Sequence, residues 1–317
     1  MHIYLIEKKD KLGNIKKLLK PYGKVIVLHK TGKDINKYTE LFRDREEKIL
    51  AVSPVLIDYK LPNKYIDKIQ NLKGIVTKSA WAHYIDIKYC EKKNIKVANS
   101  PGANSQSVAE YAIWQMLSLS KKLPIQINYN FKVSLDDKHI GVEIKGKKVG
   151  IIGLGRVGSR IAEMAKGLGM EVIYWNRSKK KTVYKAVSLN KLLQEADFVF
   201  KCVEICQETN NILNKENLKY LKKEAYVISV FGGLGWGGKD DFILLDMVEK
   251  GRIAGFSVEN DHKKGTKIKS RYKGNVFIPA ALAWHTKETH QRYNQIWADG
   301  IIGIIKGKQV NRIRSKS

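Results

Sequence analysis

Cysteine and long hydrophobic runs are scarce in this 317-residue chain, and each scarcity excludes a class of protein. The three cysteines are Cys90, Cys202 and Cys206, an odd number without a C-x-x-C spacing, which argues against a disulfide framework and against a zinc or other metal site. No apolar run approaches the roughly 18 residues that span a bilayer. The N-terminal segment turns charged after six residues, so it has no secretory signal. We therefore expect a cytoplasmic protein with no membrane association.

Acidic residues are also few. Asp and Glu number 31 against 59 Lys and Arg, which gives a formal net charge of +28. Such an excess is compatible with a polyanionic partner, but 49 of the basic residues are lysine and only 10 are arginine, the residue that specific phosphate and base readers favour. A compositional bias is the simpler explanation. A nucleic-acid binder is not expected, because the chain has no recognition motif, while another anionic partner stays open.

Short apolar runs alternate with lysine-rich stretches in the first hundred residues. The runs 24–29, 49–54, 74–78 and 96–100 are typical of buried strands, and helices are expected between them. This alternation indicates a parallel sheet covered on both faces. A long helix is then expected to begin near Asn104 or Ser105, whose side chains can cap it, and to end at Pro124.

A glycine motif, Gly153-x-Gly155-x-x-Gly158, lies between an expected strand at 149–152 and a helix, with a second strand at 171–175. This context makes the motif a strong indication of a dinucleotide-binding βαβ unit. Gly153 permits the tight turn, Gly155 lets the backbone approach a pyrophosphate, and Gly158 lets helix and strand pack closely. The N-terminus of the helix adds free N–H groups and a positive field.

The residues after that second strand indicate which dinucleotide binds. An acidic residue there would accept a hydrogen bond from the ribose 2′-hydroxyl of NAD and repel the 2′-phosphate of NADP. The chain has instead an amide, an arginine, a hydroxyl and three ammonium groups: Asn176, Arg177, Ser178, Lys179, Lys180 and Lys181. These groups suit a 2′-phosphate, so the sequence predicts NADP(H) as the cofactor, with an unusual NAD site as the alternative.

Further βα units complete the chain. Apolar runs at 198–203, 226–231, 251–258 and 275–284 are expected strands, with helices near 189–196, 216–222 and 241–250. The last helix, from about Thr286 to Ile305, is long enough to carry the chain back to the first domain. The sequence therefore predicts an α/β fold.

Several motifs, in order, resemble the D-2-hydroxyacid dehydrogenase (D-isomer-specific) family, most of all its glyoxylate and hydroxypyruvate reductases. The resemblance runs from about Ile49 to Gly307 and is carried by segments 100–112, 146–178, 187–199, 207–230, 249–259 and 283–292. It implies two Rossmann-like domains with doubly wound parallel sheets and an inter-domain cleft, and a homodimer. The substrate domain would be 1–99 plus 288–317, and the dinucleotide-binding domain 100–287. Arg156 and Val157 would lie at the pyrophosphate, and Glu259 replaces an aspartate near the nicotinamide amide.

The family transfers hydride between nicotinamide and a 2-keto acid, and the resemblance implies three side chains for this reaction. An arginine clamps the substrate carboxylate, a histidine donates the proton, and a carboxylate keeps the histidine charged. This chain departs from each: Phe231 stands at the arginine position, Ala281 at the histidine position and Lys264 near the carboxylate position. Trp81 also replaces a glycine where backbone amides receive the substrate. We therefore do not expect ordinary 2-keto acid reduction.

Other side chains near these positions are candidates for the missing roles. The candidates for proton transfer are His285, His83 and Tyr84, each of which could equally be structural. The expected pocket wall is apolar and consists of Trp81, Phe231, Ala281, Trp236 and Trp284. Such a wall suits a neutral electrophile, for example an enone, an imine or a dehydroamino acid, because nothing would pair with a free carboxylate.

One charge cluster is local. Segment 262–274 has no acidic residue and would lie beside the cleft, where it could clamp an anionic substrate that is phosphorylated, carrier-bound or part of a peptide, unless it is only a solvated loop. The sequence thus predicts an NADP(H)-dependent oxidoreductase on the D-2-hydroxyacid dehydrogenase scaffold, with a non-standard active site. The alternative is a catalytically inactive NADP-binding pseudoenzyme that acts as a sensor or scaffold.

Overall fold

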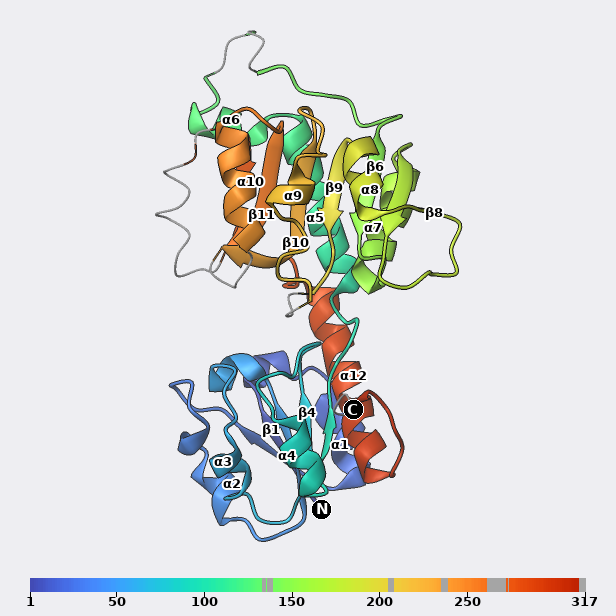
Figure 1. The fold of residues 1–317 in the computed structure, drawn as a ribbon. Coiled ribbons are helices and arrows are strands. Elements are labelled where there is room, and N and C mark those ends of the chain that lie inside the picture. Colours follow the sequence, from blue (N-terminus) through green and yellow to red (C-terminus); the bar gives the residue numbers. More distant parts are fainter. Residues whose placement is uncertain are drawn as a thin grey trace. The chain divides into compact units, whose positions relative to one another are not determined.

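The computed structural model describes residues 1–132, 135, 139–204, 208–234, 239–260, 272 and 274–313. It divides into two compact units (Figure 1): the first unit is Met1–Asn104 with His285–Ser317, and the second unit is Ser105–Trp284. Each unit has a parallel sheet of the Rossmann-like type, so the predicted fold class is confirmed. No helix in the described part of the chain is long and apolar enough to cross a membrane.

The sheet of the first unit has six strands in the order β13-β5-β4-β3-β1-β2. Its parallel strands are β1 (His2–Ile6), β2 (Lys24–Leu28), β3 (Lys48–Val52), β4 (Leu72–Thr77) and β5 (Lys96–Ala98), and β13 (Arg312–Ile313) pairs antiparallel with β5. The order 2-1-3-4-5 is flavodoxin-like. The sequence analysis did not assign β1. Its alternate residues enter two separate core clusters, because both faces of the sheet are buried.

Short helices connect these strands. They are η1 (Lys9–Lys11), α1 (Ile15–Leu19), η2 (Lys20–Tyr22), η3 (Ile35–Lys37), α2 (Thr39–Arg43), η4 (Pro54–Ile57), α3 (Asn63–Ile66) and α4 (Ile87–Lys92). The long α12 (Lys287–Ile305) completes the unit. The side chain of Thr286 caps α12 by accepting from the N–H of Thr289, and the buried Trp297 donates from Nε1 to the carbonyl of Val76 in β4 at 2.9 Å. The predicted last helix, and its packing on the N-terminal sheet, are confirmed.

The sheet of the second unit has seven parallel strands in the order β12-β11-β10-β9-β6-β7-β8. They are β6 (Lys148–Ile152), β7 (Glu171–Trp175), β8 (Lys185–Ala186), β9 (Phe198–Lys201), β10 (Tyr226–Leu234), β11 (Gly255–Asn260) and β12 (Val276–Phe277). Its helices are α5 (Ser105–Ser120), α6 (Leu123–Asn128), α7 (Arg156–Gly167), α8 (Leu189–Glu195), α9 (Lys215–Leu218) and α10 (Lys239–Glu249). Strand order reverses between β6 and β9, the point at which ligands bind in such sheets.

The expected end of the first long helix is wrong. Helix α5 stops at Ser120, and Lys122 then adopts the left-handed conformation with φ of 57°. Pro124 is the second residue of α6, where its missing N–H leaves no helical hydrogen bond unmade. The chain therefore turns before the proline, which starts a helix and does not end one.

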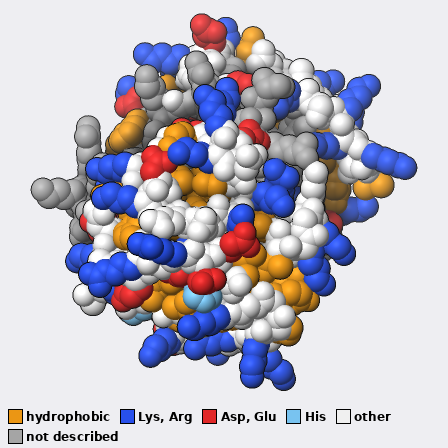
Figure 2. All heavy atoms as spheres, turned by 90° about the horizontal axis from the view of Figure 1, so that it is seen from below, with side chains coloured by type: hydrophobic (Ala, Val, Ile, Leu, Met, Phe, Trp, Pro, Cys, Tyr) orange, Lys and Arg blue, Asp and Glu red, His pale blue; other side chains and the backbone are white. Residues whose placement is uncertain are grey.

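Positive charge is spread over the surface. In Figure 2, Lys and Arg side chains are scattered across the visible face with acidic side chains between them. Three lysines of the described part of the chain are nevertheless buried: Lys48, Lys78 and Lys201. Lys48 donates to three backbone carbonyls at 2.6–2.9 Å, and the other two meet carboxylates. Each buried ammonium group is therefore compensated locally, as burial of a charge requires.

Candidate functional site

The glycine loop of the second unit has the geometry that a dinucleotide requires. Gly153 has φ of 98°, and its N–H donates to the carbonyl of Trp175 at 2.9 Å. A Cβ atom on Gly153 would lie 2.8 Å from the carbonyl oxygen of Cys202, and one on Gly158 would collide with the carbonyl of Gly153. A Cβ atom on Gly155 would meet nothing within 4 Å. The first and third glycines are thus fixed by protein contacts, whereas the space over the second is open.

Helix α7 begins directly after Gly155, and no side chain caps it. Its first N–H groups therefore remain available to an anion, and the helix dipole favours negative charge there. Arg156 and Val157 occupy the first turn, Arg156 exposed and Val157 buried. These residues fit the pyrophosphate of a nicotinamide dinucleotide.

The end of β7 carries the residues predicted to meet a 2′-phosphate. Asn176 donates from Nδ2 to the carbonyl of Ser178 at 2.9 Å, which holds the turn. Arg177 forms an ion pair with Glu208, Nη1 to Oε2 at 2.5 Å, and both side chains are largely exposed. Lys179 is exposed and, within the described part of the chain, has no ion-pair partner. The sequence analysis missed Glu208, because nothing in a separation of 31 residues indicates that the two side chains meet.

Glu259 and Ala281 are neighbours at the carboxyl end of β11. Asn260 pairs with the segment that carries Ala281: its N–H donates to Pro279 at 2.9 Å, and its carbonyl accepts from Ala281 at 3.1 Å. Oε1 of Glu259 accepts from the N–H of Ala283 at 3.2 Å. Burial raises the pKa of Glu259 to about 7, and the hydrogen bond from Ala283 opposes that rise. A carboxyl group that binds a proton near neutral pH therefore lies at the end of β11, next to the residue that pairs with the Ala281 segment.

Apolar side chains lie at the same edge of the second unit as this carboxyl group. Phe231 lies in β10 between the residues that pair with Val258 and Asn260 of β11. Phe231 and Trp284 are both half-buried and pack against the same core cluster. The structure thus brings Phe231, Glu259 and Ala281 to one edge of the second unit.

The side chain of Asn260 is unusual there. It is 3% exposed, yet neither its Nδ2 nor its Oδ1 has a hydrogen-bond partner among the described residues. A buried amide without partners costs free energy, and a ligand that supplies a donor and an acceptor would relieve that cost. The sequence analysis did not single out Asn260.

The candidates in the first unit lie in the loop after β4. Trp81 is half-buried, and its ring lies 5.5 Å, centroid to centroid, from that of the exposed His83. Tyr84 donates to Oγ1 of Thr77 at 2.5 Å, and burial raises the pKa of Tyr84. A phenol that holds its proton this firmly is a poor proton donor, which favours a structural role for Tyr84.

His285 belongs to a cluster that the sequence analysis did not find. Its Nδ1 lies 3.0 Å from Nε2 of His290, one turn into α12. Burial lowers the pKa of His290, and the positive charges of His285, Lys11 and Lys78 lower it further, while Glu7 opposes them. Lys78 and Glu7 directly follow β4 and β1, whose carboxyl ends lie at one edge of the sheet, but without β1 and the strand order the sequence could not indicate that the two residues meet.

Lys78 and Glu7 are themselves a buried ion pair. Nζ of Lys78 lies 2.9 Å from Oε2 of Glu7 and 5.2 Å from the ring centroid of Trp297. Burial lowers the pKa of Lys78, and the carboxylate of Glu7 opposes this shift. The histidine pair therefore lies within electrostatic range of a buried ion pair whose two charges compensate each other.

Cys202 is buried, and burial raises the pKa of its thiol, so it is not an activated nucleophile. Other residues from the sequence analysis lie outside the described residues: Cys206, Trp236, Lys264 and most of 262–274.

Together, the glycine loop and the two parallel sheets define an NAD(P)-binding α/β protein. A family model described as "D-isomer specific 2-hydroxyacid dehydrogenase, NAD binding domain" matches residues 113–261. The chain is similar to a hydroxypyruvate reductase of Thermotoga maritima, 30% identical over 220 residues that cover 67% of this chain and 71% of that protein. It is also similar to a glyoxylate reductase of Thermofilum pendens, 26% identical over 298 residues, 89% of this chain and 86% of that one.

Two solved structures share the fold. One is an acyclic imino acid reductase in complex with NADPH and D-Arg, with a TM-score of 0.82 and 23% identity over 99% of this chain and 100% of that one. The other is a glyoxylate reductase from Paecilomyes thermophila, with a TM-score of 0.83 and 19% identity over 99% and 98%. The chain belongs to the D-isomer-specific 2-hydroxyacid dehydrogenase family, a family of NAD(P)-dependent oxidoreductases.

Proposed function

We propose that this protein is an NADP(H)-dependent reductase whose substrate is a neutral or carrier-bound electrophile, such as an imine, an enone or a dehydroamino acid, and not a simple 2-keto acid. The observation that carries the proposal is that Phe231 and Ala281 lie at the same edge of the second unit as the protonatable Glu259. By resemblance, an arginine and a histidine belong at the first two positions. Without the arginine, a substrate carboxylate would have no partner, and its desolvation would be costly.

The choice of NADP(H) rests on the end of β7. Arg177 can form bidentate hydrogen bonds to a phosphate, and Lys179 adds a second positive charge without an acidic partner in the described ranges. The similar fold of a reductase solved with NADPH supports this choice. When bound, the nicotinamide supplies the hydride.

The chain's own residues would then serve the reaction in two ways. Phe231 and Trp284 present apolar surface, which excludes water and suits an uncharged substrate. Glu259 accepts at Oε1 from the N–H of Ala283, so in the protonated form its proton belongs on Oε2, where it can be given to the nitrogen or carbon that gains electrons. His285, joined to His290, is the second candidate for the proton.

A direct assay tests the proposal. We expect purified protein to oxidise NADPH with at least one of 1-pyrroline, cyclohexenone and the methyl ester of N-acetyldehydroalanine, and to oxidise it far more slowly with glyoxylate or hydroxypyruvate. Rapid turnover of either keto acid would overturn the substrate class. Failure to bind NADPH would overturn the cofactor assignment.

The departures from the family's catalytic set also favour a second candidate, a pseudoenzyme that binds NADP(H) and signals to a partner. It predicts tight NADPH binding without turnover of any of the five compounds.

We further propose a homodimer, and an anionic or carrier-bound group on the substrate that meets the basic segment 262–274. Sedimentation of the purified protein tests the dimer, and neutralising lysines of that segment should raise KM only for carrier-bound or phosphorylated substrates.

A further inference from the structure

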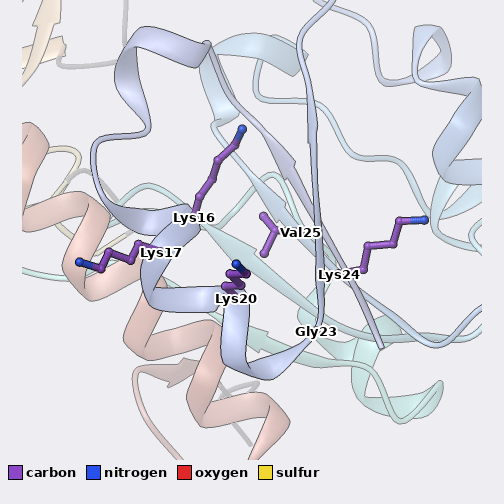
Figure 3. A pocket seen from close by; sticks show the side chains of 6 residues that line it. All are labelled: Lys16, Lys17, Lys20, Gly23, Lys24 and Val25. Carbon is purple, nitrogen blue, oxygen red and sulfur yellow. The ribbon is translucent and has the colours of Figure 1, made fainter.

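A basin on the first unit is surrounded by lysines (Figure 3). It is formed by α1, η2 and the start of β2, is largely open to solvent and has a volume of about 510 Å³. Its lining consists of Lys16, Lys17, Lys20, Gly23, Lys24 and Val25. All four lysines are exposed, and none of the lining residues is acidic. The basin is separate from the cofactor loop, which lies in the second unit.

Local sequence explains why the lysines are exposed around the basin. Ile15 and Leu19 are fully buried in the core of the unit, so α1 presents Lys16 and Lys17 outward, and Lys20 follows at the start of η2. Gly23 is needed because a Cβ atom there would lie 2.5 Å from the carbonyl oxygen of Met1, which accepts from the N–H of Lys24. The close approach of the backbone at Gly23 therefore sets the start of β2 against the start of the chain, directly after η2.

The charges at this basin are uncompensated. None of the four lysines forms an ion pair with any residue that the structure describes, whereas many other lysines do. Lys16 and Lys20 are four residues apart, a spacing at which like charges on a helical turn destabilise it. In Figure 3, these two side chains stand near Val25, and Lys17 and Lys24 point away from it on opposite sides.

Protection of a sheet edge explains only part of this arrangement. Strand β2 is the edge of the sheet, and a lysine such as Lys24 blocks pairing with another chain. The three lysines of the helical turn are not on the edge strand and need another reason. Lys306 adds a further cation beside the basin, with Nζ 5.1 Å from the ring centroid of Tyr22.

We propose that this basin binds a small molecule that carries two or more phosphate groups. Lysine ammonium groups bind phosphate as point charges, and several around one basin can hold several phosphates at once. The volume is in the range of small-ligand sites. Val25 and the lysine stems offer apolar contact to the rest of the ligand. A single-stranded nucleic acid would need stacking aromatic faces along the groove, and no aromatic residue lines the basin among the described residues.

The test uses inorganic tripolyphosphate as the probe, titrated calorimetrically into the full chain at low salt. The double variant K16A/K20A should weaken binding at least tenfold. The control K88A/K92A removes two exposed lysines with the same spacing from α4, and it should change binding less than twofold. Thermal unfolding checks the fold of both variants. Because each variant removes two neighbouring like charges, its unfolding temperature should be unchanged or higher.

Four results would overturn the proposal. The first two concern tripolyphosphate binding: equal weakening by both double variants, or no weakening by K16A/K20A. The other two concern the ligand: monophosphate binding as tightly as tripolyphosphate, or an oligouridylate or acidic peptide binding more tightly than tripolyphosphate. ATP and ADP, titrated in the same way, distinguish a nucleotide from a free polyphosphate as the source of the phosphates. NADPH oxidation by K16A/K20A should remain at the wild-type rate, so this inference and the proposed function fail separately.

Discussion

Replacing Arg177 with glutamine tests how the end of β7 selects the cofactor. Hydrogen bonds to a charged group contribute about 1.5–3 kcal/mol each, and about 1.4 kcal/mol is tenfold in affinity. R177Q should therefore weaken NADPH binding by about 10- to 150-fold and leave NADH binding unchanged, since NADH lacks the 2′-phosphate. Arg177 is largely exposed, so solvent screening favours the lower part of that range.

Glu208 supplies the matched second variant. Its carboxylate already occupies Arg177, and a 2′-phosphate must displace it. An exposed ion pair is worth about 0–1 kcal/mol, so E208Q should strengthen NADPH binding by up to about fivefold. In the R177Q background, the same substitution should have less effect, because the ion pair is already absent.

The assay is a titration of protein fluorescence with NADPH and with NADH at two salt concentrations. The NADPH preference that we propose should fall at high salt, because the interaction is between exposed charges. Equal weakening of NADPH and NADH by R177Q would refute the assignment of this turn to the 2′-phosphate. Weaker NADPH binding by E208Q would refute the displacement argument.

Three further predictions concern individual titratable side chains. K201M leaves the carboxylates of Asp240 and Asp241, each 3.0 Å from Nζ, buried without their cation. It should lower the free energy of urea unfolding by about 3–5 kcal/mol, against about 0–1 kcal/mol for the exposed control K250M. A loss below about 1 kcal/mol for K201M would contradict this expectation. The pKa of Glu259 is raised from 4.5 to about 7, so its contribution to stability is fully present below pH 4.5 and is lost as the pH rises through 7. E259Q should therefore gain stability relative to wild type from pH 5 to pH 8, by up to about 3 kcal/mol. A difference in Tm that does not change with pH would show that Glu259 does not titrate in this range. H285Q should raise the pKa of His290 in an NMR titration, because the positive neighbour is gone, and an unchanged pKa would contradict their proximity.

Features encoded in neighbouring residues could be predicted from the sequence. The glycine loop was found because three glycines at fixed spacing meet steric limits that the structure shows at Gly153 and Gly158. Helix α12 was found because its cap at Thr286 and its apolar periodicity are local signals. Strand β1 was missed because its four apolar residues, Ile3 to Ile6, have no preceding turn signal.

Side-chain pairs between distant segments could not be predicted in this way. The pairs Arg177–Glu208 and Lys78–Glu7 join residues 31 and 71 positions apart, and they depend on which strands are neighbours. Glu259 was noted as a cofactor residue, but its protonation depends on burial by segments that follow it in the chain. Strand order, which sets these contacts, is not contained in the pattern of any one segment.

The three buried lysines have a practical consequence. Nζ of Lys48 is enclosed by the carbonyls of Asp44, Glu46 and Gln70, and Lys78 and Lys201 are held by carboxylates in the first and second units. An amine-acylating reagent would modify the many exposed lysines of the native protein at once, yet reach these three only after the surrounding strands separate. Mass-spectrometric readout of Lys48 and Lys78 on one side, and Lys201 on the other, would thus report the opening of each unit independently during unfolding.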